Sequence, residues 1–176
     1  MKVLHLISGG DIGGARTHIL NLLLEMQKRI DVKLVCFIKE DFYYVLKDKG
    51  INIEVYEQKN RFSFSIIKKL AHEIKSEGYE IIHCHGARAN FIASILKFFC
   101  EVPVVTTIHS DYMLDFKGSF YKNIVYKNLN ILSLKTMDYY ICVSDNFRKM
   151  MINRGFNEKK MFVVYNGINV KDNIRS

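Results

Sequence analysis

Short apolar runs alternate with longer amphipathic segments along most of this 176-residue chain. The short runs are rich in β-branched residues and almost continuously apolar, which is typical of strands buried on both faces of a sheet. Such runs predict strands at 2–8, 32–38, 52–56, 80–84, 102–108, 139–143 and 161–165. Helices are expected between them, beginning near Ala15, Asp41, Ser63, Ala87, Phe116 and Asp145. The order predicts an α/β fold, a doubly wound, mostly parallel sheet of about seven strands flanked by helices.

The segment after Ser63 shows the helical pattern most clearly, and Ser63 itself suits an N-cap. Gly78 and Gly155 each follow a helical run and suit a left-handed cap. One face of the helix that follows Ser63 is apolar, with Ile66, Ile67, Leu70, Ala71 and Ile74. The opposite face is polar, with Lys68, Lys69, His72 and Lys75.

Composition narrows the class of protein. Hydrophobic residues make up 49% of the chain and proline occurs once, so a packed core is expected and disorder is not. No apolar run reaches the roughly 20 residues that a membrane span needs. The cysteines at 36, 84, 100 and 142 stand alone in apolar runs, which indicates buried thiols in a reducing compartment and a cytoplasmic protein.

The net charge of +8 favours an anionic partner, such as nucleotide phosphates, acidic lipids or nucleic acid. Nucleic acid is not expected, because zinc spacing, an RNP-like aromatic motif and a recognition-helix signature are all missing. The lysine-rich, acid-free segment 117–135 raises a further hypothesis, peripheral contact with an anionic inner membrane face. The alternative, a helix packed on the sheet with solvated lysines, is favoured. The apolar residues of this segment are Phe120, Tyr121, Ile124, Val125, Leu129 and Leu132.

Polar or glycine-rich stretches follow four of the predicted strands, at 8–18, 83–88, 106–111 and 143–146. Parallel strands end at a common edge of their sheet, and ligands of such sheets bind there, so these stretches are expected to line one cleft. The first stretch has four glycines within 9–14, directly before a helix. Its amides and the helix N-terminus would suit a phosphate, and a merely tight strand-to-helix turn remains the alternative.

The histidines at this edge allow several interpretations. His83 and His85 alternate along one strand, so their rings would point to the same side. No third ligand is evident near them, so ordinary hydrogen-bonded histidines are favoured over a metal site. The sequence has no DxD pair, which argues against a metal chelated by a nucleotide diphosphate. It also lacks the GxGxxG motif, which argues against a nicotinamide dinucleotide. His109 ends a buried strand at the same edge.

Together these stretches resemble the N-terminal domain of glycosyltransferase family 4, whose members have the GT-B fold. Residues 13–18, GGARTH, are similar to the GGxxxH loop of that family. Residues 81–85, IIHCH, resemble its strand-four HxH stretch, with Glu80 in place of the usual aspartate. Residues 104–109, VVTTIH, and 141–144, ICVS, resemble its next two strand ends. Residues 163–169, VVYNGIN, look like its hinge VIPNGVD, with Tyr165 and Asn169 as departures.

The resemblance implies that residues 1–166 form an N-terminal, acceptor-side, Rossmann-like domain and that 167–176 begin an interdomain hinge. A second, donor-binding domain would then be missing from this chain. It also implies a retaining, metal-independent and cofactor-free glycosyltransferase. Such an enzyme would move a sugar from a nucleotide-diphosphate sugar to a sugar or lipid-linked acceptor, in glycan or cell-envelope synthesis. The isolated chain is expected to be inactive, and a stand-alone Rossmann-like ligand-binding module or adaptor is the alternative.

The resemblance also implies roles for individual residues. Gly13 and Gly14 would approach the donor diphosphate. His109 would be the catalytic residue, placed near the transferred sugar to hydrogen-bond and orient it. The acceptor side would be lined by His18, His85, Arg88 and Ser144.

Overall fold

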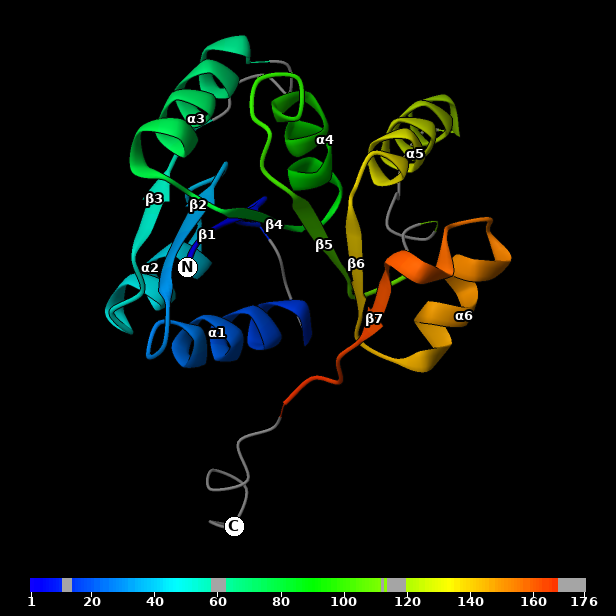
Figure 1. The fold of residues 1–176 in the computed structure, drawn as a ribbon, viewed down its shortest axis with the longest axis horizontal. Coiled ribbons are helices and arrows are strands. Elements are labelled where there is room, and N and C mark those ends of the chain that lie inside the picture. The colour runs from blue at the N-terminus through cyan, green and yellow to red at the C-terminus, as the bar shows by residue number, and fades with distance from the viewer. Residues whose placement is uncertain (11–13, 58–62, 112, 114–119, 168–176) are drawn as a thin grey trace.

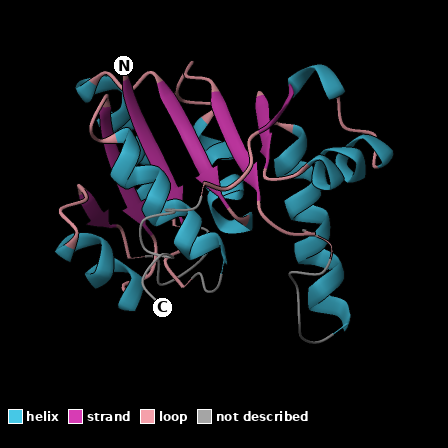
Figure 2. Ribbon diagram, turned by 90° about the horizontal axis from the view of Figure 1, so that it is seen from below, coloured by secondary structure: helices cyan, strands magenta, loops and turns pink. Residues whose placement is uncertain are grey.

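The computed structural model describes residues 1–10, 14–57, 63–111, 113 and 120–167, with side chains left out at 120–124. Its strands form one seven-stranded sheet in the order β3-β2-β1-β4-β5-β6-β7. Every neighbouring pair is parallel, so all strand arrows point toward the same edge (Figure 2). The strands are β1 (Lys2–Ile7), β2 (Asp31–Cys36), β3 (Ile53–Val55), β4 (Ile81–His85), β5 (Val104–Ile108), β6 (Tyr139–Cys142) and β7 (Met161–Val163).

Helices cover the sheet from both sides. They are α1 (Gly14–Met26), α2 (Asp41–Asp48), α3 (Phe64–Glu77), α4 (Ala87–Leu96), α5 (Phe120–Lys135) and α6 (Asp145–Asn153), and a 3₁₀ turn spans Glu158–Lys160. Figure 1 shows α1 and α2 on one side of the sheet and α3, α4 and α5 on the other. Right-handed crossovers explain this division, because the chain runs outward one way from β1 to β3 and the other way from β3 to β7. The predicted doubly wound fold is confirmed.

Alternating residues of a strand pack in two separate hydrophobic cores, one on each face of the sheet. On β1, Val3 and Ile7 belong to the core beneath α1 and α2, whereas Leu4 and Leu6 belong to the larger core beneath the other helices. Met151 of α6 also packs in the larger core, which places α6 on that side. Since both faces of β1 are buried, its continuous apolar run has a direct structural reason.

Local predictions are confirmed in position and corrected in detail. Ser63 is the N-cap residue of α3, but its hydroxyl makes no capping bond and lies 3.0 Å from the hydroxyl of Ser65. Gly78 has the left-handed conformation expected of it, with φ 69°. All four cysteines are buried and free. The helix start expected near Phe116 lies outside the described residues, and α5 begins at Phe120.

A buried acid ties α3 to the sheet. Glu73 lies on the packed side of α3 and is only 7% exposed. Its carboxylate accepts from Lys33 of β2 at 2.6 Å and from the hydroxyl of Tyr56, and Lys33 also pairs with Glu54. A buried carboxylate is tolerated because it is paired and hydrogen-bonded.

The lysine-bearing helix α5 packs beside α4, with Asn130, Ser133 and Leu134 buried. Val125 and Leu132 are exposed together with Asn128 and Lys135, so the outer face of the helix mixes apolar and polar side chains. Contact with an anionic membrane remains a prediction, and residues 117–119 lie outside the described part. Among the described residues, no helix has both the length and the apolar character needed to cross a bilayer.

Candidate functional site

The carboxyl edge of the sheet has a topological switch point between β1 and β4. From β1 the chain turns to α1 on one face, and from β4 it turns to α4 on the other. In open parallel sheets this divergence leaves room at the edge, where ligands bind. The polar stretches that follow β1, β4, β5 and β6 share this edge because the strands are parallel.

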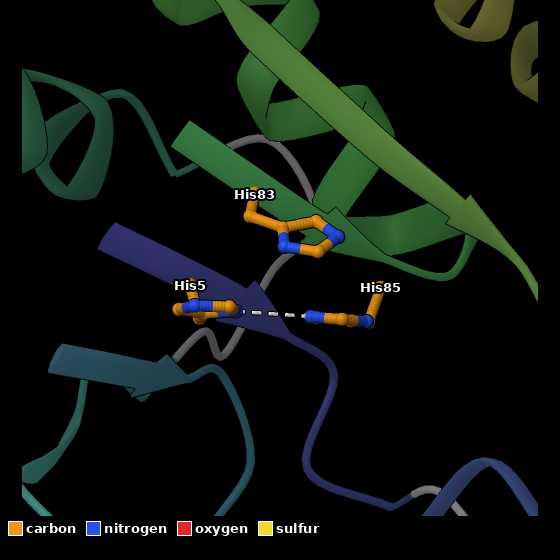
Figure 3. A group of neighbouring side chains, drawn as sticks. All are labelled: His5, His83 and His85. Carbon is orange, nitrogen blue, oxygen red and sulfur yellow. Dashed lines mark hydrogen bonds between the residues drawn. The ribbon is translucent and has the colours of Figure 1, made fainter. Parts of the chain in front are cut away.

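Five of the six histidines of the chain gather at this switch point. The parallel register places His5 of β1 opposite His83 of β4, on the same face of the sheet. Figure 3 shows the rings of His5 and His85 edge to edge, with His83 beside them. His109 follows β5, and His18 of α1 approaches it with ring centroids 5.0 Å apart. The sixth, His72, is exposed on α3.

Hydrogen bonds connect most of these rings. The Nδ1 atom of His5 lies 3.1 Å from Nε2 of His85, and Nδ1 of His85 lies 3.3 Å from Nε2 of His109. His83 is held separately, since its Nε2 lies 2.7 Å from the hydroxyl of Thr107. The outermost nitrogens of the chain of rings, His5 Nε2 and His109 Nδ1, are buried and have no hydrogen-bond partner among the described residues.

Burial keeps these imidazoles uncharged at neutral pH. Loss of solvent lowers the pKa of His5 to about 3 and that of His109, more weakly buried, to about 4. Burial, with the other histidines adding to it, holds the pKa values of His83 and His85 well below their usual range. His109 is therefore an uncharged imidazole at neutral pH.

Three of the rings have the composition of a metal site. Ligand nitrogens of His5, His83 and His85 all lie within 4.8 Å of one another. The sequence pattern did not reveal a third ligand near His83 and His85, and the structure shows that His5 lies in that position. However, the nitrogens of His5 and His85 are already at hydrogen-bonding distance from each other. That the site holds no metal remains a prediction.

The glycine-rich loop enters the edge through a constrained turn. Gly9 has φ 102°, and a Cβ atom there would lie 2.3 Å from the backbone oxygen of Ile38. Gly14 begins α1 and is exposed, with open space where a side chain would be. The backbone at Gly14 is thus accessible to a ligand at the helix N-terminus. Gly13 lies outside the described residues.

Replacing Gly9 tests how tightly this turn is built. We expect Gly9→Ala to lower the free energy of unfolding by about 3 kcal/mol, because the methyl group meets a backbone oxygen in a conformation that L-residues avoid. The matched control is Gly155→Ala, at φ 80° with open space around it, which should cost only about 1 kcal/mol. Urea denaturation measures both, and equal losses would contradict the close approach at Gly9.

Two other predicted site residues, Arg88 and Ser144, lie along the same edge. Arg88 is half-buried in the first turn of α4. Ser144 follows β6 and caps α6, its hydroxyl accepting from the amide of Phe147 at 3.3 Å. Beyond His109, Asp111 pairs with Arg154 through two hydrogen bonds of 2.7 and 2.8 Å. This ion pair fixes the segment after β5 against the end of α6.

The fold and the edge site define a doubly wound α/β domain of the kind that binds a ligand at its switch point. The model of glycosyltransferase family 4 matches residues 12–172, and the chain therefore belongs to that family. The expectation from the sequence motifs is confirmed.

Two solved structures share the fold of this chain, and one further glycosyltransferase is similar to it in sequence. Anabaena Alr3699/HepE, solved in complex with UDP and with UDP-glucose, covers 97% of this chain at a TM-score of 0.77 and 20% identity. A glycosyltransferase from Rickettsia africae covers 97% at a TM-score of 0.74 and 17% identity. An uncharacterized glycosyltransferase of Methanocaldococcus jannaschii, MJ1607, is 32% identical over 94 residues, or 52% of this chain. The matched regions span 45%, 44% and 24% of those three proteins, so this chain corresponds to less than half of each.

Proposed function

We propose that this chain is the N-terminal, acceptor-side half of a retaining, metal-independent glycosyltransferase that uses a nucleotide-diphosphate sugar. The observation that carries the proposal is the meeting of α1 and His109 at the switch point, through the ring contact of His18 with His109. The start of α1 and a neutral, partly exposed imidazole thereby come together at one edge in a chain of this family. Residues 1–166 would form this domain, and 167–176 the beginning of a hinge.

The start of α1 would serve the donor diphosphate. Departure of a nucleoside diphosphate builds negative charge on the leaving oxygen, and backbone amides at a helix N-terminus favour that charge. Gly14 stands at this position without a side chain to keep the ligand away. Gly13 would take part in the same contact.

His109 would act at the transferred sugar. Its ring is neutral because burial lowers its pKa to about 4, so it can hydrogen-bond a sugar oxygen without being charged. His85 is buried with both ring nitrogens bonded to other histidines, and it would therefore act through His109 rather than touch the acceptor. His18 and Arg88, both partly exposed, and Ser144 would face the acceptor.

UDP-glucose is the first donor to test, because a protein of the same fold, HepE, was solved with it. The acceptor would be a sugar or lipid-linked sugar of glycan or cell-envelope synthesis, reached from the cytoplasm or from the inner membrane face. The exposed Val125 and Leu132 of α5 give such a membrane contact an apolar surface. A second domain would complete the donor site and exclude water, which competes as an acceptor.

Turnover of the sugar donor tests whether transfer requires the second domain. We expect the 176-residue chain to release no UDP from UDP-glucose above the uncatalysed rate, and the complete natural protein to release it with transfer to an acceptor. The measurement is UDP release with mass analysis of the sugar product. Sugar transfer by residues 1–176 alone would contradict the proposal.

A further inference from the structure

His109 stands on a short bridge of chain between two fixed points. One is Ile108, the last residue of β5, which is 4% exposed and packs in the larger core. The other is Asp111, which pairs with Arg154, the C-cap residue of α6. Only two residues, His109 and Ser110, lie between these points, so the bridge has three Cα–Cα steps of about 3.8 Å each.

Hydrogen bonds from two sides hold the carboxylate of Asp111. Its Oδ1 atom accepts from Nη1 of Arg154 at 2.7 Å, and its Oδ2 atom accepts from Nη2 at 2.8 Å. Oδ1 also accepts from the amide of Met113 at 2.9 Å, and Met113 packs against the larger core. A bidentate pair of an arginine with a carboxylate fixes orientation as well as distance. Asp111 therefore has a defined position and direction.

Arg154 can anchor this acid because the end of α6 is tied into the core. Its amide lies 3.1 Å from the carbonyl oxygen of Met151. Gly155 follows with φ 80°, the left-handed conformation that closes a helix. Phe156 then packs in the larger core, with its ring centroid 5.6 Å from that of Tyr140 of β6. The partner of the acid is thus fixed to the body of the domain.

The two fixed points limit where the imidazole of His109 can lie. With both ends of the bridge held, few backbone conformations remain for the two residues between them. In the conformation observed, Nε2 of His109 lies 3.3 Å from Nδ1 of His85, and its ring centroid lies 5.0 Å from that of His18. A bridge released at Asp111 would be held at Ile108 alone, and the ring would no longer be kept against α1.

We propose that Arg154 is a positioning residue, which acts through Asp111 to hold His109 against α1 at the switch point. Both terminal nitrogens of Arg154 bond to the carboxylate, so its part is to place another residue rather than to touch a substrate. The position of the ring stands independently of the proposed function. Only its effect on sugar transfer rests on that function.

Proton NMR of the 176-residue chain measures this position through the nuclear Overhauser effect between the rings of His18 and His109. We expect a cross-peak between them in the wild type and its loss in Arg154→Met, which cannot pair with the acid. Arg154→Lys keeps the charge without the bidentate geometry, so it should retain a weakened cross-peak.

Arg148→Met is the matched control. Arg148 lies on the same helix and pairs with Asp145 and Glu158, neither of which belongs to the segment after β5. Its replacement removes ion pairs of α6 but none that reach the bridge, so the cross-peak should stay as in the wild type.

Each outcome decides the proposal. An unchanged cross-peak in a folded Arg154→Met variant would overturn it, and so would absence of the cross-peak from the wild-type chain. Equal loss in Arg148→Met would show that the ring follows α6 as a whole, which overturns the specific part of Arg154. If Arg154→Met does not fold, Asp111→Asn keeps an acceptor for the amide of Met113 and removes the charge. This variant should weaken the cross-peak, and an unchanged one would again overturn the proposal.

The consequence for transfer is measured in a protein that joins this domain to the proposed donor-binding domain. We expect Arg154→Met to lower kcat on the order of tenfold with little change in KM for the donor, because a displaced ring alters the reacting geometry. Arg154→Lys should recover part of the loss, and Arg148→Met should stay near wild type. Failure of the wild-type protein to transfer any sugar would reject the proposed function and leave the NMR result standing. A normal kcat for Arg154→Met without the cross-peak would overturn the part of the proposal that concerns transfer.

Discussion

Lowering the pH from 7.5 to 5.5 should reduce the free energy of unfolding by about 4 kcal/mol through His5, His83 and His85 alone. Burial lowers the folded-state pKa of His5 to about 3 and those of His83 and His85 well below the usual value of 6.5. In the unfolded chain these histidines take up protons below about pH 6.5, and in the folded chain they do not. Above that pH the buried histidines do not reduce the unfolding free energy. Below it, each of them lowers the unfolding free energy by about 1.4 kcal/mol for each pH unit.

The groups around the cluster do not cancel this effect. His18 and His109 also have lowered pKa values because they are partly buried, so they change stability in the same direction. The carboxylates of Asp111 and Asp138, whose ion pairs with Arg154 and Lys97 lower their pKa values, lose their contribution only at lower pH. The fall in unfolding free energy between pH 7.5 and 5.5 is thus caused mainly by the histidines.

Urea denaturation at the two pH values measures the loss. His5→Leu should reduce the pH-dependent part by about 1.4 kcal/mol, whatever its effect on stability at pH 7.5. His72→Asn, at an exposed position on α3, is the comparison variant. An unfolding free energy that stays flat between the two pH values would show that the cluster is solvated or already charged.

The architecture could be predicted from sequence because its signals are local. All seven strands fall where apolar runs predicted them, with ends shifted by up to two residues. The largest shift of a strand start is at β5, predicted from Val102 and found from Val104. Pro103 has no amide to donate, and the amide of Val104 bonds to Asp138 instead of the backbone of a strand. At the edge strand β7, the shift reflects pairing on only one side.

The candidate site could be predicted only in part. His85 and His109 could be predicted because they stand at strand ends, where the edge of a parallel sheet brings them together, and His83 because it alternates with His85. His5 was not, although a histidine in the middle of a buried strand is a visible anomaly. Its role depends on the register of β1 against β4, which brings together residues 80 positions apart. Nothing in a single sequence fixes that register. The same holds for Glu73, whose partner Lys33 lies 40 positions away.

Replacing His109 should have the largest effect on activity. In a protein that joins this domain to the proposed donor-binding domain, we expect His109→Ala to lower kcat/KM for sugar transfer on the order of 100-fold. The reason is that an imidazole held by His85 at the switch point would be lost from the place where charge and geometry change during transfer. His109→Asn keeps an amide donor on a shorter side chain and should recover part of the loss. Thermal unfolding of each variant shows whether its fold is intact.

The most direct measurement is the rate at which a protein that joins this domain to the proposed donor-binding domain transfers a sugar from UDP-glucose, compared between His109→Ala and the exposed control His72→Ala. If the edge of the sheet where α1 meets His109 is half of the transfer site, His109→Ala is slow and His72→Ala matches the wild type. If both folded variants keep wild-type rates, the reaction takes place elsewhere and the site assigned at the switch point is wrong.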